Sequence, residues 1–322
     1  MKQAAGFSLL LVLLASGQEP RGVTKNDIDH WMTELSNWGR WGKSDEIGTV
    51  NLVTPAKRKE AAKLGREGVT VSLEHPIDVV KSNENPSPFL HEMTATGENP
   101  RTMFAMDRYS VSFHGYTHSH MDALCHMFYQ GHMYNGIPQT EVTKAGASQL
   151  DIASFHNGIV TRGVLIDIPR LKGVPYLEPG DGVYPEDLDA WLKKTGLKVE
   201  GGDVLLVRFG RWARRASKGQ WMVGQNAPGL YPTSVRWIRQ HDVAVLGSDG
   251  VQDILPSPVE GVYQPIHQLM LIALGTPLLD NLDLEALAET TNRLRRWDFQ
   301  ISLAPLAVPG GTGSPLNPIA SF

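Results

Sequence analysis

The stretches Asp203-Val-Leu-Leu-Val-Arg-Phe209 and Val243-Ala-Val-Leu-Gly247 decide the fold class of this chain, together with the helical pattern of Thr233–His241 between them. Each stretch is a short, almost continuous apolar run, which is typical of strands buried on both faces of a sheet. Apolar strands joined by helices indicate an α/β protein, or an α+β protein with a mixed sheet. We predict an α/β fold, a mixed β-sheet with packed helices.

The rest of the chain continues this alternation of short strands and helices. Thr54-Pro55 begins a helix, because threonine is a good N-cap and proline fits the first helical position. Residues 83–100, rich in Asn, Pro, Ser and Glu, are predicted to form a long exposed loop. Further strands are expected at 69–73, 109–113, 163–168 and 298–303, and further helices at 185–194, 266–274 and 284–289. Neither a repeat nor a linker interrupts this order, so residues 18–322 are predicted to form a single domain.

The composition excludes several classes of protein. Of the 322 residues, 41% are hydrophobic and 20% are charged, which is ordinary for a globular protein. The formal net charge of −4 gives no basic excess, so we expect no nucleic-acid partner. Cys125 is the only cysteine of the sequence, so no disulfide can form within the chain.

Residues 1–17 have the features of a secretory signal peptide. Lys2 is followed by the mostly apolar run Ala4–Ala15, and Ala15-Ser16-Gly17 supplies the small residues that a signal peptidase recognises. Cleavage is predicted before Gln18, which would leave an exported protein, either periplasmic or secreted. The apolar run is shorter than the about 20 residues that a membrane span needs, and no other stretch is long enough. The alternative is an N-terminal core helix.

A cluster of histidines around one acid indicates a metal site. The stretch reads His114-Gly-Tyr-Thr-His118-Ser-His120-Met-Asp122-Ala-Leu-Cys-His126, and imidazole together with carboxylate suits Zn, Mn or Fe. In an extended segment His118, His120 and Asp122 point the same way, and in a helix Asp122 and His126 are one turn apart. We predict that a strand or loop turns into a helix near Asp122 and gathers His120, Asp122 and His126. The alternative is a histidine-rich surface turn or a set of core histidines.

The segment Thr117–His126 resembles the metal motif of the cyclase family of metal-dependent hydrolases, which includes bacterial kynurenine formamidase and isatin hydrolase. The resemblance implies one domain with a mixed sheet and helices of the swivelling β/β/α type. It also implies self-association, so a homo-oligomer (a dimer or larger) is expected. Other segments look like the longer branch of this family: Trp38–Gly42, Gly48–Leu52, Asp122–Tyr129, Met133–Gly136, Gly202–Leu206 and Gly310–Phe322.

The resemblance also implies a set of metal ligands. The second histidine, the aspartate and the last histidine of the family motif match His120, Asp122 and His126. His267, in Pro265-Ile-His267, matches a histidine that joins the metal site later in the chain. Asp280 stands where a glutamate is usual, one methylene shorter, and could reach the metal through a water molecule or hold a ligand in place.

Tyr116 is the main departure from the family pattern, because it stands where the first metal-binding histidine is expected. A phenol with an unperturbed pKa of about 10 is a weak ligand at neutral pH. Together with the shorter acid, this predicts one tightly held ion per chain, centred on His120, Asp122 and His267, and a second position that is weak or empty. The alternative is a rebuilt pair of positions in which His118 or His114 replaces the missing histidine.

The chemistry that the resemblance implies is hydrolysis of a small amide, either cyclic or an N-formyl group on an aromatic. A divalent metal, Zn or Mn, would activate a water molecule, and His126, which the resemblance also places among the metal ligands, would act as general base and acid. The alternatives are an exported metal- or ligand-binding protein without turnover, and a cyclising or dehydrating enzyme. Trp31, Trp38 and Trp41 could stack on a planar small-molecule substrate, or equally serve as core or dimer-interface anchors.

Overall fold

The computed structural model describes residues 22–322 and builds them around one nine-stranded mixed sheet. In chain order its strands are β1 (Thr70–Ser72), β4 (His120–Asp122), β7 (Ile159–Asp167), β9 (Val204–Arg208), β11 (Val245–Ser248), β12 (Leu278–Asp280), β13 (Asp298–Leu303), β14 (Gly313–Pro315) and β15 (Ile319–Ser321). Their order across the sheet is β1-β15-β13-β7-β9-β11-β12-β4-β14. The four strands β7, β9, β11 and β12 run parallel, and every other pairing is antiparallel.

The two apolar stretches that predict the fold class form adjacent central strands. β9 and β11 pair from Val204↔Val245 to Val207↔Ser248, and all of these side chains are buried. The predicted helix between them is α6 (Ser234–Gln240). Continuous apolar runs suit this position because both faces of a central parallel strand are covered. The α/β class with a mixed sheet is therefore confirmed.

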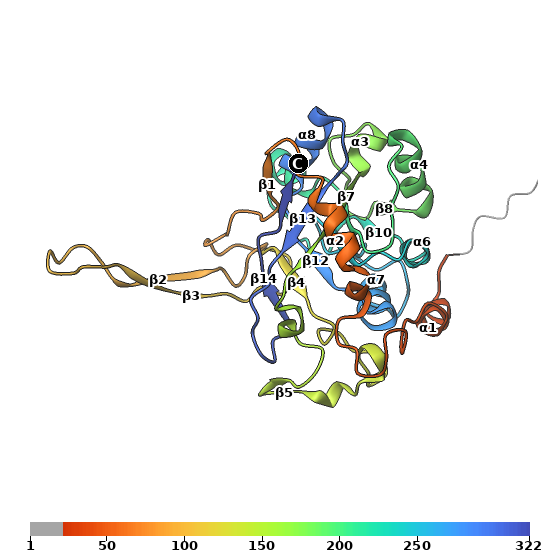
Figure 1. Ribbon diagram of the computed structural model, residues 1–322, viewed down its shortest axis with the longest axis horizontal. Coiled ribbons are helices and arrows are strands. Elements are labelled where there is room, and N and C mark those ends of the chain that lie inside the picture. Colours follow the sequence, from red (N-terminus) through yellow and green to blue (C-terminus); the bar gives the residue numbers. More distant parts are fainter. Residues whose placement is uncertain (1–21) are drawn as a thin grey trace, which may run out of the picture.

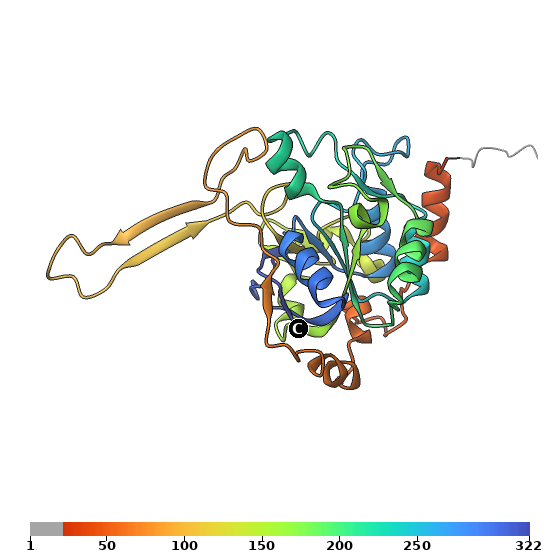
Figure 2. The same cartoon turned by 90° about the horizontal axis from the view of Figure 1, so that it is seen from above.

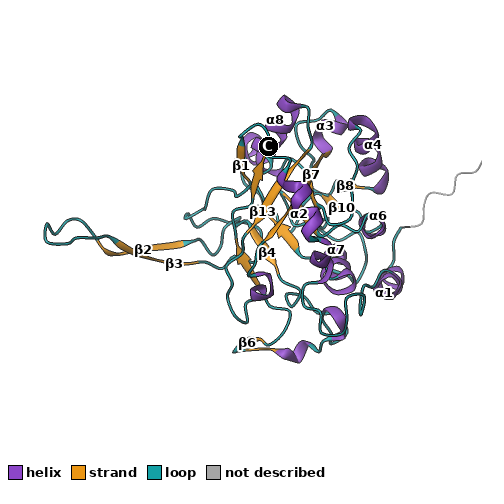
Figure 3. Ribbon diagram, in the orientation of Figure 1, coloured by secondary structure: helices purple, strands orange, loops and turns teal. Residues whose placement is uncertain are grey.

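Helices pack around the central sheet (Figure 3). The predicted helix after Thr54 is present, with the Thr54 hydroxyl accepting a hydrogen bond from the Lys57 amide at 3.2 Å. The π-helical segment Gln268–Leu274 continues α7, as the predicted helix over 266–274 requires. The α-helices are α1 (Lys25–Glu34), α2 (Pro55–Ala62), α3 (Ile168–Lys172), α4 (Pro185–Thr195), α5 (Arg211–Lys218), α6, α7 (Pro265–His267) and α8 (Glu285–Leu294). Short 3₁₀ turns span Gly48–Leu52, Tyr134–Gly136, Gln139–Glu141 and Ile152–Phe155, and short paired strands are β5 (Val142–Thr143), β6 (Gly146–Ala147), β8 (Gly182–Val183) and β10 (Gly229–Leu230).

A two-stranded ribbon projects far from the body of the molecule (Figures 1 and 2). It consists of β2 (Leu90–Ala95) paired antiparallel with β3 (Met106–Ser110), and we call residues 90–110 the arm. The prediction of a structureless loop over 83–100 is therefore wrong for the strand part. The prediction of exposure holds for most of this segment but is wrong for Glu84 and Asn85, which are buried. The strand predicted at 109–113 lies three residues earlier, at β3. Neither strand has a buried face, so no alternation of apolar and polar residues could have marked it.

The predicted signal peptide, residues 1–17, lies outside the described residues. Among residues 22–322, no helix has both the length and the apolar character needed to cross a membrane.

Candidate metal centre

Strand β4 places two of the predicted ligands at the centre of the site. It lies between β12 and β14, and its register opposes His120 to Asp280 and Asp122 to Leu278. His120 and Asp122 are two residues apart on one strand, so their side chains share a face. The antiparallel pairing of β4 with β12 then brings the Asp280 carboxylate to the same face.

The segment after β4 is a turn, so the prediction that a helix begins near Asp122 is wrong. The His126 amide donates to the Ala123 carbonyl at 3.0 Å, and no helix follows in this part of the described chain. The turn nevertheless returns the His126 side chain to the site, where its Nε2 atom lies 3.9 Å from Asp122 Oδ2. The predicted grouping of His120, Asp122 and His126 therefore exists, reached by a different backbone path.

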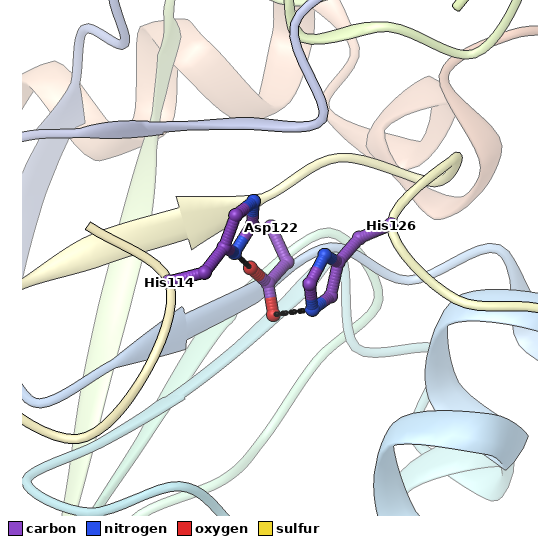
Figure 4. Close-up of side chains that lie close together, drawn as sticks. All are labelled: His114, Asp122 and His126. Atoms are coloured by element: carbon purple, nitrogen blue, oxygen red, sulfur yellow. Dashed lines mark ion pairs between the residues drawn. The ribbon is translucent and has the colours of Figure 1, made fainter. Parts of the chain in front are cut away.

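Three side chains form what we call the outer group: His114, Asp122 and His126 (Figure 4). His114 Nδ1 lies 3.0 Å from Asp122 Oδ1. The imidazole rings of His114 and His126 stack with centroids 3.9 Å apart. These two histidines are 29% and 28% exposed, whereas Asp122 is 1% exposed, so the outer group opens to solvent on its histidine side.

A second set, the inner group, consists of His120, Asp122 and Asp280, all buried. His120 Nε2 lies 3.5 Å from Asp122 Oδ1 and 4.0 Å from Asp280 Oδ2. His267 adjoins this group, with its Nε2 atom 3.6 Å from Asp122 Oδ2 and 3.5 Å from Asp280 Oδ2. Asp122 belongs to both groups and so joins two positions at which an ion could bind.

Hydrogen bonds to the Nδ1 atoms of His120 and His267 leave the Nε2 atom of each ring available to bind a metal. His120 Nδ1 lies 2.8 Å from the His118 carbonyl, and His267 Nδ1 lies 2.6 Å from Asp253 Oδ2. Both partners only accept hydrogen bonds, so Nδ1 carries the proton in each ring. Nε2 then faces the carboxylates and can give its lone pair to a cation, which is the arrangement that holds a metal-binding histidine in place.

The charges of the site fit a cation. Burial works to raise the pKa of Asp122, but His126, His114, His120 and His267 outweigh it and hold that pKa well below its usual range. Within the described chain, no backbone group and no side chain other than a histidine donates a hydrogen bond to Asp122, and Asp280 Oδ1 has no hydrogen-bond partner there. A buried carboxylate without such a partner is costly unless a positive charge compensates it. The donor set of imidazole nitrogens and carboxylate oxygens matches Zn or Mn.

His126 and His267 differ in protonation near neutral pH, and therefore in whether they must lose a proton to bind a metal. Burial lowers the pKa of His126 to about 4, against the attraction of Asp122, so its imidazole is neutral at pH 7. Burial also works to lower the pKa of His267, but Asp280 and Asp253 raise it well above the usual value. His267 is therefore protonated near neutral pH without a metal, and binding a cation there would release a proton.

Two candidate ligands lie outside both groups. The Tyr116 hydroxyl lies 2.8 Å from the Tyr263 hydroxyl, and burial raises the pKa of Tyr116 further from neutrality. His118 contributes its carbonyl, not its side chain, because residue 118 precedes β4 and does not follow the alternation of that strand. Tyr116 therefore supplies no ligand. His114, one of the two residues predicted as a replacement for the missing histidine, lies at the site in its place. This geometry favours two positions over the single position that the sequence predicts.

A pocket of about 250 Å³ adjoins the outer group. Its lining includes Phe113, His114 and Tyr116 and the segment 84–87. None of the three clustered tryptophans lines this pocket. Trp31 is buried in the core, and Trp38 donates from Nε1 to the Ile272 carbonyl at 2.6 Å, so these two side chains anchor the N-terminal segment to the body.

Sequence reasoning missed Asp253, which orients His267. The one available signal was an acid just beyond a predicted buried strand, since polar groups at the carboxyl ends of parallel strands often form binding sites. Asn281, which holds the carbonyl that orients His120, and Arg211, which holds Asn281, carried no signal, because neither residue type suggests a metal site.

Comparisons with known proteins agree with this geometry. Residues 52–252 match a family model described as "Putative cyclase". A crystal structure of a protein described as a novel cyclase superposes with a TM-score of 0.80 and 32% sequence identity, covering 90% of this chain and 98% of its own. No curated protein sequence matches the chain.

Isatin hydrolases share the fold at lower identity. Isatin hydrolase A from Ralstonia solanacearum gives a TM-score of 0.55 at 20% identity, with 81% of this chain and 95% of that chain covered. Isatin hydrolase A from Labrenzia aggregata, bound to benzyl benzoate, gives 0.56 at 21% identity, with 78% and 93% covered. The family model spans more than half of the chain, and the cyclase crystal structure matches nearly all of it. This protein is therefore a member of the cyclase family.

Proposed function

We propose that this protein is a metal-dependent hydrolase of small amides, of the cyclic or N-formyl aromatic kind. The observation that carries the proposal is Asp122, a buried carboxylate whose close polar partners in the described chain are four histidine side chains. The isatin hydrolases that share the fold support the choice of an amide in a ring. Zn or Mn are the proposed ions.

The residues of the site would have two roles in such a reaction, metal binding and proton transfer. His120, Asp122, Asp280 and His267 would hold one ion, and His114 with Asp122 would hold a second, next to which His126 keeps its nitrogen free for proton transfer. A divalent cation at these positions would polarise a carbonyl and lower the pKa of water. His126, neutral at pH 7 and partly exposed at the edge of the site, accepts the proton from the attacking water and returns it to the leaving nitrogen.

The proposed substrate site is the pocket next to His114. His114, a partly exposed member of the outer group, lines this pocket, so a substrate whose carbonyl lies at the metal centre can place its ring there. Phe113 and Tyr116 offer aromatic surface there, and aromatic rings favour stacked or edge-on contacts with planar groups.

The test combines metal analysis with a panel of substrates. The purified protein is dialysed, its metal content is measured, and isatin, N-formylkynurenine, small lactams and lactones are offered with added Zn or Mn. We expect about two ions per chain and turnover of at least one amide. Tight metal binding without any turnover would favour the alternative, a metal- or ligand-binding protein. Loss of water from a hydroxylated substrate would favour the other alternative, a cyclising or dehydrating enzyme.

We further infer that the arm binds a second copy of this chain. An isolated two-stranded ribbon is marginal in water, and its tip side chains Met103 and Phe104 are 93% and 64% exposed. Opposite charges lie side by side along the arm, in the ion pair of Arg108 with Glu92. This pair is satisfied within the arm, so the exposed apolar tip is the surface that a twofold partner would cover in a self-complementary interface.

The double substitution Met103→Ser with Phe104→Ser should convert a dimer or larger assembly to a monomer, because it removes the apolar tip of the arm. Light scattering after size-exclusion chromatography gives the mass. Leu306→Ser is the matched control, since Leu306 is 60% exposed on the body and not on the arm. A monomeric wild-type protein, or an unchanged mass of the double variant, would contradict the inference.

A further inference from the structure

A buried carbonyl oxygen links the metal centre to the start of α5. The His118 carbonyl accepts from His120 Nδ1 at 2.8 Å and also from Asn281 Nδ2 at 3.2 Å. Asn281 Nδ2 donates as well to the Gly115 carbonyl at 2.8 Å. The side-chain amide of Asn281 therefore fixes the His118 carbonyl, which orients His120 of the inner group. It also fixes the loop that begins with His114 of the outer group.

Asn281 is itself held on every side. Its side-chain oxygen accepts from Arg211 Nη1, so its amide nitrogen must face the two carbonyls. Its carbonyl accepts from the Ser119 hydroxyl at 2.8 Å, and its amide donates to the Gly250 carbonyl at 2.8 Å. The residue is fully buried and directly follows the candidate ligand Asp280. Rotation of the Asn281 side chain would break hydrogen bonds at both ends.

Arg211 is the fixed end of this network. Its Nη2 atom donates to Glu84 Oε1 at 2.9 Å and also to the Tyr116 carbonyl. Its guanidinium lies 4.3 Å from the centre of the Trp212 ring. The Arg211 amide donates to Asp249 Oδ2 at 3.1 Å, which anchors the first turn of α5. A guanidinium that is 97% buried and bound to three chain segments has little freedom to move, because its planar fork matches all of its partners.

We propose that Arg211 and Asn281 are positioning residues that set the metal affinity of the site through the His118 carbonyl. The inference rests on the proposed function, because it assumes that His120 and His114 bind a metal. Groups that orient a metal-binding histidine without touching the metal typically change the affinity by about 10- to 100-fold. Neither residue contacts the space between the ligands, so their effect is on the geometry of the site and not on its charge.

Two variants test the network from its two ends. Asn281→Gly removes the amide, and glycine tolerates the backbone φ of +56° at this position. Arg211→Lys keeps the charge but loses the fork that holds Asn281 and Glu84 together. The dissociation constant for Zn is measured by competition with a chelator of known affinity, and thermal unfolding of the metal-free protein is measured in parallel. We expect each variant to bind Zn about 10- to 100-fold more weakly.

Matched controls separate positioning from general loss of stability. Asn37 is a buried asparagine whose Nδ2 atom donates to the Leu274 carbonyl at 2.9 Å, away from the site. Arg208 is a buried arginine that pairs with Asp167 and Glu285. Asn37→Gly and Arg208→Lys should lower the unfolding temperature while leaving the Zn affinity unchanged.

The outcomes are distinct. Weakened Zn binding in the Asn281 and Arg211 variants, with normal binding in both controls, supports the inference. Equal affinity in all four variants, or equal losses in all four, overturns it. If Asn281→Gly fails to fold, Arg211→Lys decides alone. A wild-type protein that binds no Zn or Mn would remove the proposed function together with this inference, whereas normal wild-type binding with unaffected variants would remove the inference alone.

Discussion

Replacing Asp122 by asparagine should nearly abolish metal binding while sparing the fold. Asp122 is the one carboxylate that belongs to both the inner and the outer group. Asparagine has almost the same shape but no charge, so both positions lose their shared anion. The variant should therefore contain almost no metal after dialysis, and its unfolding temperature should not rise on addition of Zn or Mn, unlike that of the wild type.

Asp203→Asn is the matched control for this experiment. Asp203 is also a buried aspartate, but it directly precedes β9 and pairs with Lys57 and Arg162, which are not part of the site. Its substitution should destabilise the protein, because a buried ion pair loses one partner, and leave the metal content normal. Normal metal content in Asp122→Asn would remove Asp122 from the candidate ligands and, with it, the link between the two groups.

Replacing His126 by alanine should lower turnover by at least about 10²-fold, the typical contribution of a general acid–base group. His126 Nε2 lies 3.9 Å from Asp122 Oδ2, so it can reach a water molecule that is bound at the site. Because His126 also belongs to the outer group, metal analysis accompanies the kinetics. We expect the ion of the inner group to remain, since His120, Asp280 and His267 are intact.

His132→Ala is the control for His126. His132 comes six residues later in the same histidine-rich segment, but its side chain is exposed and its Nδ1 atom contacts the Gln130 carbonyl. Its removal should leave both turnover and metal content unchanged. Full turnover of His126→Ala with any substrate that the wild type cleaves would exclude His126 from proton transfer.

The fold class follows from local sequence patterns because those patterns report burial directly. β9 and β11 are continuous apolar runs, and both are buried central strands. Thr54 and Gly196 mark helix ends through their own backbone and side-chain preferences, and both cap helices in the structure. The arm could not be predicted, because strands without a buried face carry no pattern of apolar residues.

The sequence by itself determined the metal-binding chemistry of this protein, and part of its geometry. His120 and Asp122 are two residues apart, so any strand at that point places both side chains on one face. The sequence of β4 alone does not show which of His114, Tyr116 and His118 supplies a metal ligand. That depends on the conformation of the loop before β4. The hydrogen bonds of Asn281 and Arg211 with the 115–118 carbonyls hold that loop, and they come from residues about 100 to 170 positions away in the chain. Only the tertiary structure brings the remaining residues to the site. The pairing of β4 with β12 brings Asp280 and Asn281 there, and the packing of α7 brings His267, which Asp253 orients. Contacts between segments that are distant in the chain depend on sheet register and packing and not on local sequence.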